Sequence, residues 1–195
     1  MLETEMLKTL VEKLGGDAKV RLDFNCRISR DKFTNWLEKN LAWLKPHLDF
    51  IEDPFVYEPR EWMRIQENFG IDLALDLAAD VLAVKAEGAR VVIIKPAIID
   101  PREVLKAFAG DDRRFVFTHY MDFPIGQMSA YAEAQSLMAE EGSRIAVCGL
   151  QHHDVYEGFT FQDTIRNDGP FIVPPEGTGL GFDQLLERQD WTHIL

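Results

Sequence analysis

Four short apolar runs of the sequence each end in a residue that can do chemistry. The first three runs end in the acids Asp23, Glu52 and Asp76, and the fourth ends in Lys95. Glu52 comes 29 residues after Asp23, Asp76 comes 24 after Glu52, and Lys95 comes 19 after Asp76. Each interval is about one strand–helix–strand step, so we expect the four side chains to come from adjacent strands and to face one locus.

Three carboxylates at one locus predict a bound cation, because each pair 4 Å apart would repel by about 4 kcal/mol at an effective dielectric of about 20. An all-oxygen ligand set selects a hard ion, and Mg²⁺ is the common one, with Mn²⁺ as the alternative. Lys95 could then act as a base toward an acidic C–H or as a fixed cation beside developing negative charge. The metal would stabilise the enediolate left when the carbon next to a carboxylate loses its proton.

Strand and helix patterns alternate along the chain up to residue 150. Strands are predicted over 19–25, 48–52, 71–76, 89–95, 114–120 and 144–150. Helices are predicted over 2–14, 31–44, 59–69, 80–87, 101–109 and 125–141. Ser29 or Asp31 caps the second helix, Pro59 opens the third and Gly70 ends it.

Strands without a polar face that alternate with helices predict a parallel sheet covered by helices. A doubly wound sheet and a (β/α) barrel would both satisfy this pattern. Acids at the carboxyl ends of successive strands favour the barrel. The residues after the first strand, Asn25-Cys-Arg-Ile-Ser29, lack the glycine-rich turn of a dinucleotide-binding fold. Residues 151–195 are predicted to be a loop-rich tail that ends in a short helix.

The composition fits one large domain with a sizeable core, since 46% of the 195 residues are hydrophobic. The net charge of −12 argues against nucleic acid or an anionic membrane as a partner. No apolar stretch is long enough for a membrane span, and the charged N-terminus does not resemble a signal peptide. Cys26 and Cys148 are expected to be reduced thiols in a cytoplasmic protein.

The residues around these four side chains resemble the enolase superfamily, and most of all its o-succinylbenzoate synthase family. The matching segments are Arg-Leu-Asp-Phe-Asn at Asp23, Ile-Glu-Asp-Pro at Glu52, the acid Asp76, and Ile-Ile-Lys-Pro at Lys95. The resemblance runs from about residue 1 to the end. It implies a TIM-type (β/α) barrel that binds Mg²⁺ through the three acids. It also implies syn-dehydration of 2-succinyl-6-hydroxy-2,4-cyclohexadiene-1-carboxylate to o-succinylbenzoate in menaquinone biosynthesis.

The same resemblance suggests which residues meet the substrate. Asn25 matches the family's Asp-x-Asn pattern, and Gly149-Leu150 follows the last strand as in the family. Thr118 and His119 end the fifth strand, where one of them would face the barrel mouth. Asn25, Thr118, Gly149 and Leu150 are therefore the expected substrate-binding residues for a small carboxylate.

Other polar residues near the strand ends have simpler interpretations. Asp53, next to Glu52, is expected to support a ligand or to cap rather than to bind metal. Asp80 is expected to cap its helix, and the adjacent His152 and His153 suit a loop better than a chelate.

The family also has features that this sequence lacks. Its members carry an N-terminal capping domain and a Lys-x-Lys motif on the strand before the first acid. The second lysine of that motif is the general base, whereas the lysine that matches Lys95 stabilises the intermediate. The sequence contains no Lys-x-Lys, and Lys8 and Lys13 lie on the opening helix. Residues 1–195 are therefore expected to form an incomplete C-terminal barrel domain, whose activity alone is in question.

Two alternatives stay open at this point. The same metal and lysine could serve a racemase of N-acylamino acids or a dipeptide epimerase. A non-catalytic fragment or interaction module is the other, since an unclosed barrel leaves two sheet edges that predict self-association or pairing with an N-terminal partner segment.

Overall fold

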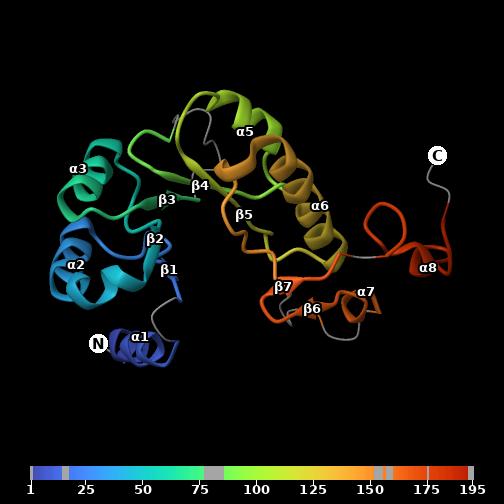
Figure 1. Cartoon of the computed structure of the whole chain (residues 1–195), viewed down its shortest axis with the longest axis horizontal. Helices are drawn as coiled ribbons and strands as arrows, with labels where there is room; N and C mark the ends of the chain where they lie inside the picture. Colours follow the sequence, from blue (N-terminus) through green and yellow to red (C-terminus); the bar gives the residue numbers. More distant parts are fainter. Residues whose placement is uncertain are drawn as a thin grey trace. The chain divides into compact units, whose positions relative to one another are not determined.

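The computed structural model describes residues 2–14, 18–76, 86–151, 156, 160–174 and 176–192 (Figure 1). Five strands form one sheet in the order β1-β2-β3-β4-β5. Their bounds are Val20–Asp23 for β1, Leu48–Glu52 for β2, Leu73–Leu75 for β3, Val91–Ile94 for β4 and Arg114–Phe117 for β5. The pairs β1–β2, β2–β3 and β3–β4 are parallel, as the strand–helix alternation predicted.

Helices connect the strands. They are α1 (Leu2–Leu14), α2 (Arg30–Leu44), η1 (Lys45–His47), α3 (Pro59–Phe69), α5 (Pro101–Ala107), α6 (Pro124–Glu141) and η2 (Gly142–Arg144). Most of the helix predicted over 80–87, with its cap Asp80, lies outside the described residues.

The predicted start and stop signals are confirmed in α2 and α3. Ser29 caps α2, where its hydroxyl accepts a hydrogen bond from the Lys32 N–H at 3.4 Å. Pro59 is the first residue of α3, and Gly70 ends that helix in the left-handed conformation, with φ +59°.

The predicted sixth strand is present only as two separate bridges. Ile145 pairs with Phe115 and Gly149 pairs with Thr118, both in the parallel sense. Between them the Val147 side chain is 72% exposed, so the ladder is interrupted where the chain turns this residue outward.

Two compact units can be distinguished in the chain. The first comprises Met1–Ile93 and Lys106–Arg114, and the second comprises Ile94–Leu105 and Phe115–Leu195.

Aromatic side chains pack the core of the first unit. Phe33, Phe55 and Trp62 are almost fully buried. The ring of Phe55 lies 5.9 Å from that of Phe33 and 6.2 Å from that of Trp62. Such tilted and edge-on arrangements are favourable, and they fix α2 and α3 to the chain that leaves β2. Figure 1 shows these two helices beside β1 and β2.

Helix α1 covers the edge strand with only part of its apolar surface. Val11 is buried in a cluster with Val20 of β1 and Leu44 of α2. Met6, Leu10 and Leu14 follow one another at intervals of four residues and are 63%, 48% and 50% exposed. A four-residue interval places them on one side of the helix, so α1 carries an exposed apolar stripe.

An ion-pair network joins the strands of the first unit at their amino-terminal ends. Arg114 donates to Asp49 at 2.7 Å and to Asp72 at 2.9 Å. Arg21 also donates to Asp49, at 2.8 Å, and Arg90 donates to Asp72 at 3.2 Å. The network therefore compensates two half-buried acids and links residues of β1, β2 and β5 with those that precede β3 and β4.

The second unit is built on α6. Its buried Gln127 donates to the carbonyl of Leu150 at 2.9 Å and so holds the end of the sixth segment. The tail beyond residue 151 contains α7 (Thr160–Asp163), an antiparallel hairpin of β6 (Asn167–Asp168) and β7 (Phe171–Ile172), and α8 (Asp183–Leu186). None of the helices in the described part of the chain is both long and apolar enough to cross a membrane.

The Asp49 carboxylate makes the stability of the fold sensitive to acid. Burial alone would raise its pKa, but hydrogen bonds from Arg114 and Arg21 outweigh burial and lower the pKa below the ordinary value. The Asp49 carboxylate therefore stabilises the fold fully above the unfolded-state pKa of about 3.9. This stabilisation is lost as the pH falls through the lower folded-state pKa. Asp49→Asn should reduce the free energy of unfolding at pH 7 by about 1.5–3 kcal/mol, the usual value of a charged hydrogen bond.

Denaturant unfolding at pH 7 and at progressively lower pH checks this expectation. The difference between the variant and the wild type should shrink in acid, because the wild type loses the same interaction there. Asp112→Asn, at an exposed acid, is the control and should change little. An equal loss at every pH would contradict the account.

Candidate functional site

The register of the first unit brings two of the predicted metal ligands together. Asp23 and Glu52 are Cα partners in the β1–β2 ladder, and the Phe24 N–H donates to the Glu52 carbonyl at 3.1 Å. Partners in a parallel ladder project on the same face of the sheet. The backbone therefore sets these two acids side by side at the carboxyl ends of their strands.

Asp76 follows from the next pairing. Glu52 is the Cα partner of Ala74, and Asp76 comes two residues later, directly after β3. Side chains alternate with a period of two along an extended chain, so Asp76 falls on the same face as Ala74 and Glu52. All three predicted ligands thus lie on one face, at the ends of three neighbouring strands.

Among the described residues, the three carboxylates do not form a ready-made metal site. The Asp23 carboxylate accepts hydrogen bonds from the Asn25 N–H at 2.7 Å and from its side-chain amide at 2.8 Å. Within the described ranges, no three His, Cys, Asp or Glu side chains lie close enough to hold a metal ion as they stand. The ligand chemistry and the backbone register fit a hard cation, and binding would require the carboxylates to converge.

The backbone after these acids is unusual. Asn25, Cys26 and Asp53 have φ values of +48°, +53° and +40° although none is glycine. Such conformations cost about 1–3 kcal/mol each and cluster at functional sites. The chain therefore accepts strain directly after Asp23 and Glu52. The left-handed backbone at these positions could not be predicted from the sequence, because glycine is its usual indicator and none of the three residues is glycine.

Lys95 belongs to the second unit and directly follows β4. Its side chain is half-buried, and Nζ lies 5.5 Å from the centroid of the Tyr120 ring. This separation is within the range of a cation–π interaction. The aromatic face would restrict the lysine to one region.

The substrate-binding residues predicted in the second unit are neighbours. Thr118 pairs with Gly149, and a Cβ at Gly149 would lie only 3.2 Å from the Thr118 methyl carbon. The enclosed hydroxyl oxygen of Thr118 has no hydrogen-bond partner among the residues that the structure describes. An unpaired buried hydroxyl calls for an explanation, and a bound ligand would supply one. Leu150 is 5% exposed, so it offers mainly its backbone.

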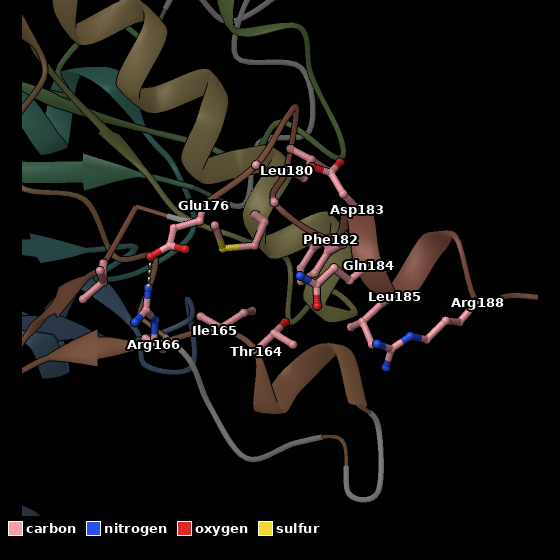
Figure 2. A pocket seen from close by; sticks show the side chains of 14 residues that line it. Thr164, Ile165, Arg166, Glu176, Leu180, Phe182, Asp183, Gln184, Leu185 and Arg188 are labelled. Atoms are coloured by element: carbon pink, nitrogen blue, oxygen red, sulfur yellow. Dashed lines mark ion pairs between the residues drawn. The ribbon is translucent and has the colours of Figure 1, made fainter.

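A cavity of about 580 Å³ lies in the tail of the second unit (Figure 2). Phe182, Leu185 and Met128 contribute apolar surface, and Arg166 pairs with Glu176 at 3.5 Å on its margin. No residue that the sequence assigned to the site is among those that line it. His152 and His153 lie outside the described residues.

Comparison with known proteins gives the fold first. A variant of muconate cycloisomerase has a similar structure, with a TM-score of 0.70 and 17% identity over 96% of this chain and 54% of that one. The chain therefore has the fold of part of that structure, which agrees with the predicted partial (β/α) barrel. No family model matches the chain.

The sequence comparison is more specific. The chain is 29% identical over 179 residues to o-succinylbenzoate synthase from Bdellovibrio bacteriovorus, which covers 90% of this chain and 54% of that protein. The resemblance inferred from the motifs is confirmed. The chain spans about half the length of the curated relative that it matches.

Cys26 offers a test of the geometry around Asp23. Burial, followed by the negative charges of Asp53 and Asp23, raises the pKa of its thiol to about 11. At pH 8 roughly one such thiol in a thousand is ionised, against about a quarter of ordinary thiols with a pKa near 8.5. In a Cys148→Ser background, alkylation of native Cys26 should be slow at pH 8 and should accelerate up to about pH 11. A native rate at pH 8 equal to that of the unfolded chain would contradict this environment.

Proposed function

We propose that this chain carries the Mg²⁺-binding part of a carbon–oxygen lyase similar to o-succinylbenzoate synthase. The reaction removes a proton and a hydroxyl group from neighbouring carbons of 2-succinyl-6-hydroxy-2,4-cyclohexadiene-1-carboxylate, which yields o-succinylbenzoate and water for menaquinone biosynthesis. The observation that carries the proposal is the shared face of Asp23, Glu52 and Asp76 at three neighbouring strand ends. The sequence match to o-succinylbenzoate synthase supports the reaction class.

Asp23, Glu52 and Asp76 would hold the ion, Mg²⁺ or alternatively Mn²⁺. When bound, it would supply positive charge against the substrate carboxylate and so favour loss of the adjacent proton. Asn25 would orient Asp23, since it already donates two hydrogen bonds to that carboxylate. Three carboxylates suit a hard cation better than an anionic group, because their oxygens carry negative charge.

Lys95 would act as a fixed cation beside the negative charge that develops on the substrate. Its half-buried position and the Tyr120 ring support this role, because both restrict the amine to one place. Thr118 would bind the substrate through its enclosed hydroxyl, and Gly149 and Leu150 would present backbone groups. Cys26 and Cys148 are not joined in a disulfide, which supports a cytoplasmic location.

The proton-abstracting base would come from a partner segment with a Lys-x-Lys motif, which this sequence does not contain. The exposed stripe of Met6, Leu10 and Leu14 on α1, which packs beside the edge strand β1, supports docking of such a segment. A strand added to β1 would extend the sheet, and its connecting helix would cover the stripe.

Metal binding is the first test. Asp23→Asn, Glu52→Gln and Asp76→Asn should each weaken Mg²⁺ binding about tenfold or more, because each removes a charged oxygen ligand. Isothermal calorimetry measures the affinity. Asp112→Asn, which changes the net charge equally at an exposed acid, should leave it unchanged. No uptake of Mg²⁺ by the wild type would refute the proposed site.

Turnover is the second test. We expect the chain alone to show negligible dehydration, and a separately supplied capping domain with the Lys-x-Lys strand to restore it, as followed by the ultraviolet absorbance of the aromatic product. Leu10→Asp should impair this restoration, whereas Met63→Asp, at a partly exposed methionine of α3, should not. Full turnover by the chain alone would contradict the need for an added base.

A further inference from the structure

We propose that Asp53 is a positioning residue for the metal site: its carboxylate holds the Asp76 backbone beside the end of β2. This inference rests on the proposed function, since it assigns Asp53 a role toward the same three ligands. It differs from the function of those ligands because Asp53 would act through Asp76 and would not touch the ion.

Asp53 is buried to an extent that is rare for an acid. The residue is 1% exposed, and its backbone adopts φ +40°. A buried carboxylate is costly unless it is hydrogen-bonded, and left-handed backbone is unfavourable for a residue with a side chain. Two unfavourable features at one position indicate that this residue has a specific task.

The hydrogen bonds around Asp53 show what the unusual backbone does. Its N–H continues the ladder toward β3 and donates to the Ala74 carbonyl at 3.0 Å. In a regular parallel ladder its carbonyl would also face β3 and accept from the Asp76 N–H. Instead this carbonyl accepts from the Cys26 N–H, beyond the end of β1, at 2.8 Å. The left-handed conformation has turned the peptide toward the other neighbour.

The side chain replaces the carbonyl that was turned away. Asp53 Oδ1 accepts the hydrogen bond from the Asp76 N–H at 3.2 Å. A single residue thus binds the chain after β1 through its carbonyl and the chain after β3 through its carboxylate. The strands that carry Asp23, Glu52 and Asp76 are tied together one residue beyond Glu52, where the sheet itself ends.

Two substitutions separate this role from the alternatives. Asp53→Asn keeps the side-chain oxygen, the size and the tolerance for left-handed backbone, but removes the charge. Asp53→Gly removes the acceptor and relieves the backbone, so it avoids the strain that alanine would suffer. Asp111→Ala is the matched control, because Asp111 Oδ1 likewise accepts a backbone N–H, that of Arg113 at 3.0 Å, before β5.

Two measurements should be made on the full chain after circular dichroism has confirmed folding. The first is hydrogen exchange of the Asp76 amide by NMR without metal, and the second is Mg²⁺ affinity by calorimetry. Asp53→Gly should raise exchange at Asp76 and weaken Mg²⁺ binding about tenfold or more, the usual effect of losing an outer partner of a ligand. Asp53→Asn should retain protection and most of the affinity, and Asp111→Ala should change neither.

The outcomes distinguish failure of the positioning role of Asp53 from failure of the proposed function. Unchanged exchange at Asp76 or unchanged affinity in Asp53→Gly would overturn the positioning role while the metal site stood. Equal loss of affinity in Asp53→Asn and Asp53→Gly would also overturn it, since it would make the Asp53 charge, rather than its hydrogen bond, the important feature. Failure of the wild type to bind Mg²⁺ would instead overturn the proposed function, and the inference with it.

Discussion

The parallel register of β1, β2 and β3 is the constraint on which the candidate site depends. Asp23 and Glu52 are partners in one ladder, and Glu52 and Ala74 are partners in the next. A slip of one residue in either pairing would move an acid to the opposite face, because side chains alternate along each strand. The bonds of Asp53 to Cys26 and Asp76 act at the point where the ladders stop and would hold the strand ends in this register.

Charge is treated differently at the two ends of these strands. At the amino-terminal ends, Asp49 and Asp72 are compensated by arginines in a network with short contacts. At the carboxyl ends, the Asp23 carboxylate accepts hydrogen bonds from the neutral Asn25. The first arrangement stabilises the fold and resists exchange of partners. The second is the arrangement that the proposed cation site would use, since (β/α) barrels carry their chemistry at the carboxyl ends of their strands.

Much of the fold could be predicted from local signals. The cap at Ser29, the proline at position 59 and the glycine at position 70 set helix ends because each has a specific backbone consequence. The apolar run predicted β2 with its observed bounds, and Phe50 and Ile51 of this strand are buried. The form of the sixth predicted strand, 144–150, could not be predicted, because an apolar pattern does not reveal where the ladder with β5 is interrupted.

The candidate site could be predicted only in its residue types. The sequence predicts that Asp53 supports a ligand or caps, but nothing in Ile-Glu-Asp-Pro reveals that its peptide turns toward β1 or that its side chain replaces a carbonyl. The partners of Asp49 and Asp72 were equally hidden, because Arg21, Arg90 and Arg114 meet them only through strand pairing. The pairing register of strands that are distant in the sequence decides such contacts, and the residue types along the chain do not reveal that register.

The most direct test of the central claim is to locate a paramagnetic ion. Mn²⁺ broadens NMR signals of nearby nuclei, so titration of the labelled protein would map its site. We expect the amide signals of Asn25, Asp53 and Asp76 to broaden first and to recover when excess Mg²⁺ displaces the Mn²⁺. Broadening that began at Asp49 and Asp72, or that spread evenly over exposed acids, would contradict a metal site at the carboxyl ends of β1, β2 and β3.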